Sequence, residues 1–144
     1  MAKKFLPERH LVQEWLAKFH PNVLQWKRPR VGPIPGQAPD KYKGVKRGWP
    51  DIVFKENNVI YIVEAKVTPT SKACGQLKEY ERLWPMTPEF SEYKDLQVKL
   101  IMLTTRDEIV VRETCEAFGI EYVIYTTPQI EAYKRKIALE GRSV

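Results

Sequence analysis

The chain has 144 residues, of which 43% are hydrophobic and 29% charged, a composition typical of one soluble globular domain over residues 1–144. It contains no run of about 18 apolar residues and no apolar N-terminal signal segment, so we expect a cytoplasmic protein without a membrane span. Two cysteines, Cys74 and Cys115, are too few for a zinc or iron–sulfur site, and we expect reduced thiols. The net charge of +6 favours a polyanionic partner, with nucleic acid ahead of an anionic membrane surface.

The first predicted element is a helix that begins at Pro7, because apolar residues recur at helical spacing as far as Phe19. A short apolar run over residues 23–26 could form a strand. Residues 27–50 are rich in proline, glycine and basic side chains, which disfavours a helix or an interior strand. A connection of this length is usually functional or mobile, so we expect a mobile basic loop.

Two β-branched, aromatic segments over residues 51–55 and 59–66 predict strands, and Asn57 and Asn58 between them suit a two-residue hairpin turn. A helix is expected to end at Trp84, followed by a strand over residues 97–104 and a helix capped by Asp107. A strand over residues 120–125 and a helix that starts after Thr127 complete the chain. This order predicts an α/β fold, a mixed β-sheet flanked by helices.

The hairpin brings charged side chains together at its open end. With a two-residue turn, Asp51 lies opposite Glu64, and Lys66 shares their face of the sheet. Opposed carboxylates cost stability unless a cation lies between them. Carboxylate oxygens suit Mg²⁺, with Mn²⁺ as a substitute, and a neighbouring lysine can orient or deprotonate a metal-bound water. The pattern therefore predicts metal-assisted phosphodiester hydrolysis.

The sequence Pro50-Asp51, a spacer and then Glu64-Ala65-Lys66 resembles the motif of the PD-(D/E)XK nuclease superfamily, which has the restriction-endonuclease-like fold. The resemblance implies a core of one helix, three strands, a helix and a strand (αβββαβ). The residues from about 107 onward would then form a C-terminal α-β-α extension. The resemblance also implies that Asp51, Glu64 and the carbonyl of Ala65 are metal ligands and that Lys66 is the catalytic lysine.

The branch of the superfamily stays open. The run from Arg47 through Gly48 and Trp49 to Pro50-Asp51 looks like the VRR-NUC branch. The chain length and the helix after the lysine are similar to those of archaeal-type Holliday-junction resolvases. The Ser-Gly stretch that resolvases tend to have before the aspartate is absent from this chain.

Two helices carry further candidate residues. Glu8 shares the inward face of the first helix with Val12 and Trp15, and the resemblance implies a metal contact for it. The alternative is an ordinary first-turn acid favoured by the helix dipole. Gln76 and Tyr80 lie four residues apart on one helix face, as in recombination-type nucleases, or they form a half-buried edge of the core.

The basic loop predicts the DNA contacts. Its lysines and arginines can bind phosphates without reading sequence, and its aromatic residues can stack on an unpaired base. A solvated surface loop is the alternative. The predicted DNA-binding residues in or beside this loop are Arg28, Arg30, Lys41, Tyr42, Lys43, Lys46, Arg47 and Trp49, and Lys72 is added from the following helix.

The leading interpretation is a Mg²⁺-dependent DNA endonuclease that cuts branched or otherwise structured DNA. A non-catalytic DNA-binding or assembly module with the same fold is the alternative, which the intact Asp51, Glu64 and Lys66 disfavour. A basic protein that binds RNA or a membrane surface is a third reading. The C-terminal extension carries no motif, and packing or homodimer formation are the roles open to it.

Overall fold

A computed structural model describes residues 4–142 of the chain. The core is one five-stranded sheet in the order β1-β2-β3-β4-β5, in which the first three strands are antiparallel and β3, β4 and β5 are parallel. The elements in chain order are α1 (Pro7–Phe19), β1 (Leu24–Lys27), β2 (Ile52–Glu56), β3 (Val59–Lys66), α2 (Ser71–Leu83), β4 (Gln97–Thr104), α3 (Ile109–Ala117), β5 (Ile120–Ile124) and α4 (Pro128–Leu139). Short 3-10 turns occupy Asp40–Tyr42, Trp84–Met86 and Pro88–Tyr93.

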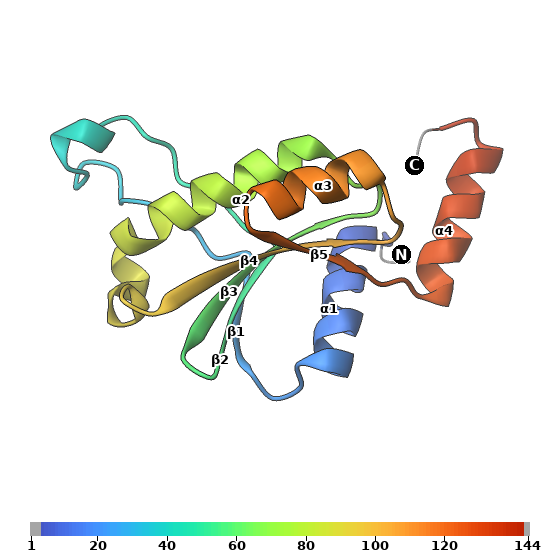
Figure 1. The fold of residues 1–144 in the computed structure, drawn as a ribbon, viewed down its shortest axis with the longest axis horizontal. Coiled ribbons are helices and arrows are strands. Elements are labelled where there is room, and N and C mark those ends of the chain that lie inside the picture. The colour runs from blue at the N-terminus through green and yellow to red at the C-terminus, as the bar shows by residue number, and fades with distance from the viewer. Residues whose placement is uncertain (1–3, 143–144) are drawn as a thin grey trace.

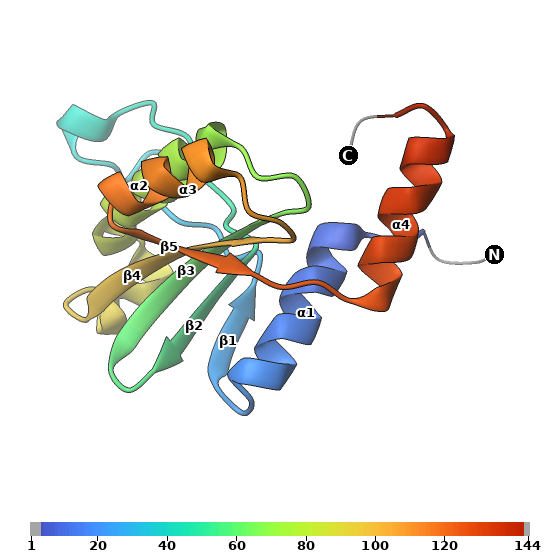
Figure 2. The ribbon, with the colours of Figure 1, turned by 45° about the vertical axis from the view of Figure 1, so that its right-hand side comes forward.

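Helices cover both faces of the sheet (Figure 1). The helices α2 and α3 lie side by side over one face, whereas α1 covers the other, and α4 packs beside α1 beyond the edge of the sheet, as the turned view in Figure 2 also shows. Successive strand residues point to opposite faces, so Val53 packs under α2 while Ile52 and Phe54 pack under α1. The predicted α/β class and the αβββαβ order with its α-β-α extension are confirmed.

The turn between β2 and β3 fixes the register of the hairpin. Asn57 and Asn58 have φ angles of 52° and 63°, and a two-residue turn of type I′ requires such positive values at both positions. Glu56 pairs with Val59 and Ile52 with Val63, as the sequence pattern predicts. A slip of one residue would move every side chain of a strand to the other face of the sheet, so this turn determines which residues meet at the open end.

The long segment between β1 and β2 is anchored at its base. Val31 is fully buried and pairs with Gly48 in an isolated antiparallel bridge, and the N–H of Gly32 donates to the Thr87 hydroxyl at 2.8 Å. Arg47 donates to Glu89 at 2.6 Å. The tip, which carries the 3-10 turn Asp40–Tyr42, projects away from the sheet at the upper left of Figure 1.

Several element boundaries differ from their predictions by one residue. The second strand, for example, starts at Ile52 instead of Asp51, although the N–H of Asp51 still donates to the Val63 carbonyl of β3 at 3.1 Å. Asp107 does not cap α3: the N-cap position is Glu108, and no side chain caps it. The Asp107 carboxylate accepts instead from Arg112 at 2.9 Å, an ion pair that replaces the predicted cap.

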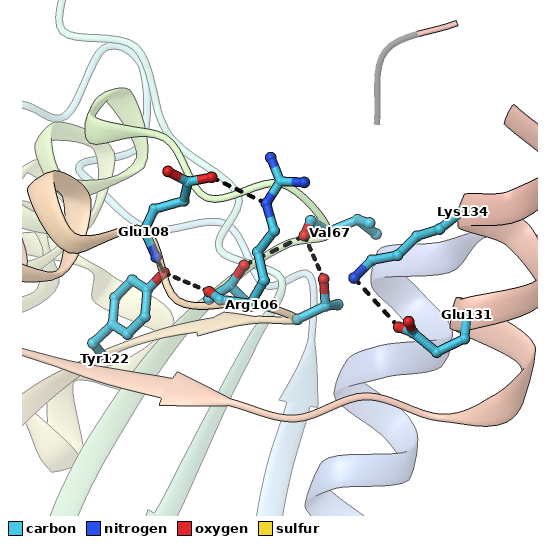
Figure 3. A network of polar contacts seen from close by, with 8 residues as sticks. Val67, Arg106, Glu108, Tyr122, Glu131 and Lys134 are labelled. Carbon is cyan, nitrogen blue, oxygen red and sulfur yellow. Dashed lines mark hydrogen bonds and ion pairs between the residues drawn. The ribbon is translucent and has the colours of Figure 1, made fainter. Parts of the chain in front are cut away.

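A polar network holds the carboxyl ends of the parallel strands together (Figure 3). The carbonyl of Val67, just beyond β3, accepts from the Thr105 hydroxyl at 2.7 Å. The hydroxyl of Tyr122 on β5 donates to the Arg106 carbonyl at 2.7 Å and accepts from the N–H of Glu108 at 3.2 Å. The end of β3 that carries the Glu-Ala-Lys motif is therefore tied to the loop that follows β4, and this loop is tied in turn to β5.

The two cysteines, distant in sequence, meet between α2 and α3. Their sulfur atoms lie 3.2 Å apart in the buried core, and both are free thiols. Burial and the neighbouring thiol Cys74 raise the pKa of Cys115 to about 12, which keeps that sulfur protonated. No helix within residues 4–142 combines the length and apolar character needed to cross a bilayer.

The hairpin turn gives a stability test. We expect Asn58→Ala to lower the free energy of unfolding by about 1 kcal/mol, because alanine lacks the tolerance of asparagine for positive φ. The matched change Asn58→Gly should leave stability unchanged or raise it, since glycine adopts that φ without strain. Urea unfolding of both variants checks this. An equal loss of stability in the two variants would show that the effect of Asn58 does not come from its positive φ.

Candidate active site

A cleft of about 720 Å³ opens between the N-terminal end of α1, the start of β2 and the end of β3. All seven residues that the sequence singled out for chemistry line it. They are Glu8, Asp51, Glu64, Ala65, Lys66, Gln76 and Tyr80. Three of these come from β3, two from α2 and one from α1, and Asp51 directly precedes β2, so the cleft is assembled from elements that are distant in sequence.

Asp51 is fixed at the start of β2 by its backbone and by one carboxylate oxygen. Its N–H donates to the carbonyl of Val63 at 3.1 Å, and its Oδ2 accepts from the N–H of Ala65 at 2.7 Å. The other oxygen, Oδ1, faces Nη1 of Arg28 at 3.7 Å. The carboxylate is therefore oriented by the neighbouring strand, while the ion pair of Oδ1 with Arg28 is long.

Glu64 follows Val63, the partner of Ile52, so it lies opposite Asp51 as the hairpin register predicts. Its side chain is almost fully buried, with 5% of the residue exposed. Burial first, and then a hydrogen bond and repulsion from Asp51, raise the pKa of Glu64 to about 9, although Lys66 opposes the rise. Without a cation, Glu64 therefore keeps its proton near neutral pH.

Tyr80 on α2 contacts the same carboxyl group. Its hydroxyl donates to Glu64 Oε2 at 3.2 Å and lies 3.5 Å from the Trp49 carbonyl. Burial and the adjacent Glu64 charge raise the pKa of the Tyr80 hydroxyl, so it remains a donor. Its ring passes close to Gly48, where an added Cβ would lie 2.5 Å from Cε1 of the ring. Glycine in the Gly48-Trp49-Pro50-Asp51 run therefore makes room for Tyr80.

The remaining candidates surround this pair. Lys66 ends β3 and is half-buried, and its charge lowers the pKa of Glu64. Glu8 and Gln76 are also half-buried and line the cleft from α1 and α2. Within residues 4–142 no three His, Cys, Asp or Glu side chains gather into a metal-binding group, so Glu8 does not join the two carboxyl groups directly.

The predicted DNA-binding residues fall into two sets. Arg28 and Trp49 line the cleft, and Trp49 keeps 49% of its surface exposed. Arg47 is only 11% exposed and pairs with Glu89, so it braces the base of the loop. The others do not line the cleft; apart from the half-buried Tyr42 they are exposed, and they are Arg30, Lys41, Tyr42, Lys43, Lys46 and Lys72.

Sequence reasoning missed two residues of the cleft wall, Arg9 and Gln13 on α1. Both side chains are exposed, and helical spacing places them off the buried stripe of Leu11, Val12 and Trp15. The end of α1 overhangs the cleft, so residues beside the buried stripe also reach it. The one sequence feature that could have identified Arg9 and Gln13 is that they lie four residues apart, and therefore on the same helix face.

The contact between Gly48 and Tyr80 yields a packing test. We expect Gly48→Ala to destabilise the fold by about 1–3 kcal/mol, because the new methyl group would force the buried ring aside. The matched change Gly75→Ala should stabilise it by about 0.5–1 kcal/mol, since Gly75 lies in α2 and an added Cβ there meets nothing within 4 Å.

Chemical unfolding in a double-mutant cycle checks the cause. In a Tyr80→Leu background, the penalty of Gly48→Ala should disappear. A penalty that persists without the ring would place the conflict elsewhere and contradict this explanation of the glycine.

No protein-family model matches the chain, and no curated protein matches it in sequence. Solved structures do match in fold. A complex of EndoMS with double-stranded DNA has a TM-score of 0.53 at 17% identity, over 88% of this chain and 48% of that chain. A repair endonuclease from Pyrococcus abyssi has a TM-score of 0.51 at 14% identity, over 88% of this chain and 50% of that chain.

A third structure, the protein of unknown function AF1548, has a TM-score of 0.54 at 13% identity, over 90% of this chain and 65% of that chain. The chain spans about half the length of EndoMS and of the Pyrococcus abyssi repair endonuclease. At these identities the likeness concerns the fold: the mixed five-stranded sheet flanked by helices is shared with part of each of these two proteins.

Proposed function

We propose that this protein is a Mg²⁺-dependent DNA endonuclease. One observation carries the proposal: the carboxyl groups of Asp51 and the buried Glu64 meet beside Lys66 in a cleft with basic side chains on its walls. The fold shared with a repair endonuclease and with EndoMS, which was solved in complex with double-stranded DNA, supports the same interpretation. The +6 charge of the chain supports a polyanionic substrate.

The donor set fits a hard divalent cation. Asp51 Oδ1 has only a long contact with Arg28 as its charge partner, and burial together with Asp51 suppresses the ionisation of the Glu64 carboxyl group. With the Ala65 carbonyl they would hold Mg²⁺, which accepts one or two carboxylates and completes its shell with water and substrate oxygens. Mn²⁺ would substitute, and Glu8 would act through a water.

Each neighbouring group has a distinct part in the proposed reaction. Bound Mg²⁺ would acidify a coordinated water and polarise the phosphoryl group. Lys66 would orient or deprotonate the attacking water, or neutralise the charge that develops on the phosphate. Tyr80 orients the buried carboxyl group of Glu64, while the Ala65 N–H orients that of Asp51. Gln76 would contact the DNA or the water shell from the α2 wall.

The rim of the cleft suits a nucleic-acid backbone. Arg9, Lys27 and Arg28 place three positive charges around the carboxyl pair. Trp49 presents a half-exposed ring at the same rim, on which an unpaired base could stack. The projecting loop lysines would extend the contact along the phosphates. These features support branched or otherwise structured DNA as the substrate.

The cleavage assay that tests the proposal uses nicked, flapped, forked and four-way DNA with Mg²⁺, Mn²⁺ or EDTA. Wild-type protein should cut one of these with Mg²⁺ or Mn²⁺ and not with EDTA. Asp51→Asn should abolish cutting, because it removes one metal ligand's charge. Lys66→Ala should slow cutting by on the order of 10²-fold or more while metal binding persists.

Lys99→Ala is the control, because Lys99 lies on β4 and does not line the cleft. Its rate should match that of wild type. Uncut DNA with every metal, together with tight DNA binding, would favour the non-catalytic module. Full activity of Asp51→Asn would show that any cutting comes from another site.

A further inference from the structure

Arg28 holds an unusual position beside the carboxyl pair. It directly follows β1, and its φ of 45° lies in the left-handed region that non-glycine residues seldom adopt. Its N–H donates to the carbonyl of Asp51 at 3.1 Å, one step beyond the pairing of Lys27 with Ile52. The backbone of Arg28 is thus held against Asp51, the same residue that the Arg28 side chain faces. A strained conformation of this kind persists where the surrounding contacts enforce it.

The ion pair between the two side chains is loose. Arg28 Nη1 lies 3.7 Å from Asp51 Oδ1, beyond hydrogen-bond distance, and the arginine side chain is 55% exposed. Exposed pairs of this kind contribute little to stability and exchange readily with other partners. Asp51 Oδ2 is already engaged by the Ala65 N–H. The guanidinium therefore faces Oδ1, the aspartate oxygen that accepts no backbone hydrogen bond within residues 4–142 and is the more open to a metal.

We propose that Arg28 is the exchangeable counter-ion of the metal site, because its guanidinium faces Asp51 Oδ1, the oxygen that a divalent cation would use. In the metal-free protein the guanidinium offsets part of the negative charge of the carboxyl pair. A bound cation displaces the guanidinium, which then pairs with a phosphate of the DNA. Arg28 is thus a positioning residue that competes with metal and then binds substrate. This inference rests on the proposed nuclease function.

Other cations near the cleft provide a contrast. The guanidinium of Arg30, two residues further along the chain, lies over the ring of Trp49 at 5.6 Å. It forms no ion pair with Asp51 in the part of the chain that the structure describes. Removing Arg30 takes away the same charge from the same loop without touching the aspartate, which makes it the matched control.

The first test measures Mn²⁺ affinity by calorimetry, without DNA. We expect Arg28→Ala to bind Mn²⁺ about three- to tenfold more tightly than wild type, because a positive charge a few ångströms from the metal is removed. Arg30→Ala should change the affinity by less than about twofold, because screening by water weakens a more distant exposed charge. Arg28→Lys should stay close to wild type, since it keeps the charge.

The outcomes separate the two proposals. If wild type binds Mn²⁺ and Asp51→Asn does not, but Arg28→Ala binds no more tightly than Arg30→Ala, the counter-ion role is wrong and the nuclease proposal stands. If wild type does not bind Mn²⁺, the nuclease proposal itself fails, and the counter-ion role fails with it.

The second test concerns the phosphate. We measure the salt dependence of binding to a duplex in Ca²⁺, with a gel to confirm that the DNA stays intact. Loss of one phosphate contact in Arg28→Ala should make the log–log slope shallower by about 1. A slope equal to that of wild type would overturn the transfer of Arg28 to the DNA.

Discussion

The carboxyl groups of Asp51 and Glu64 meet at the end of two adjacent strands, and Glu64 is buried there. Two such groups cannot both ionise at close range in a poorly solvated site without a compensating cation. The surrounding contacts act on this pair: the Ala65 N–H and the Tyr80 hydroxyl each donate to one of the two carboxyl groups, and Lys66 favours the ionised form of Glu64. In the proposed function, a bound cation would supply the positive charge that the protein itself supplies only in part.

The fold supplies the rigidity that this arrangement requires. The asparagine turn sets the hairpin register, and the bonds to the Val67 carbonyl hold the end of β3 against the loop that follows β4. On the other side, the close approach at Gly48 lets the Tyr80 ring lie beneath the loop that leads into β2. The loop base is braced in turn by Arg47 and Glu89. Side chains held by such contacts keep their orientation when substrate arrives.

The sequence predicted those parts of the molecule that depend on local rules. The strands, the helices and the two-asparagine turn follow from periodicity and turn chemistry, and the turn alone places Asp51 opposite Glu64. Helical spacing indicates which residues share a face of a helix, and Glu8, Gln76 and Tyr80, which were chosen partly by that spacing, do line the cleft. The fold class followed from the order of these elements.

Other features depend on tertiary contacts that no local pattern encodes. Arg47 was predicted to contact DNA, but it pairs with Glu89, 42 residues away in the sequence, and this pair holds the base of the loop. Arg9 and Gln13 line the cleft only because of how α1 lies over the sheet. The contact between Cys74 and Cys115 depends on two helices packing side by side. The capping prediction for Asp107 failed because Arg112 offered a competing ion pair.

The proposed function requires that the carboxyl groups of Asp51 and Glu64 bind a divalent cation. Crystals of the protein soaked in Mn²⁺ and measured at the manganese absorption edge test this directly. We expect an anomalous peak between Asp51 Oδ1 and the Glu64 carboxyl group, with the Ala65 carbonyl as a further ligand and the Arg28 guanidinium moved away. A well-diffracting crystal in which Mn²⁺ occupies other sites, with no peak between Asp51 and Glu64, would contradict the proposal.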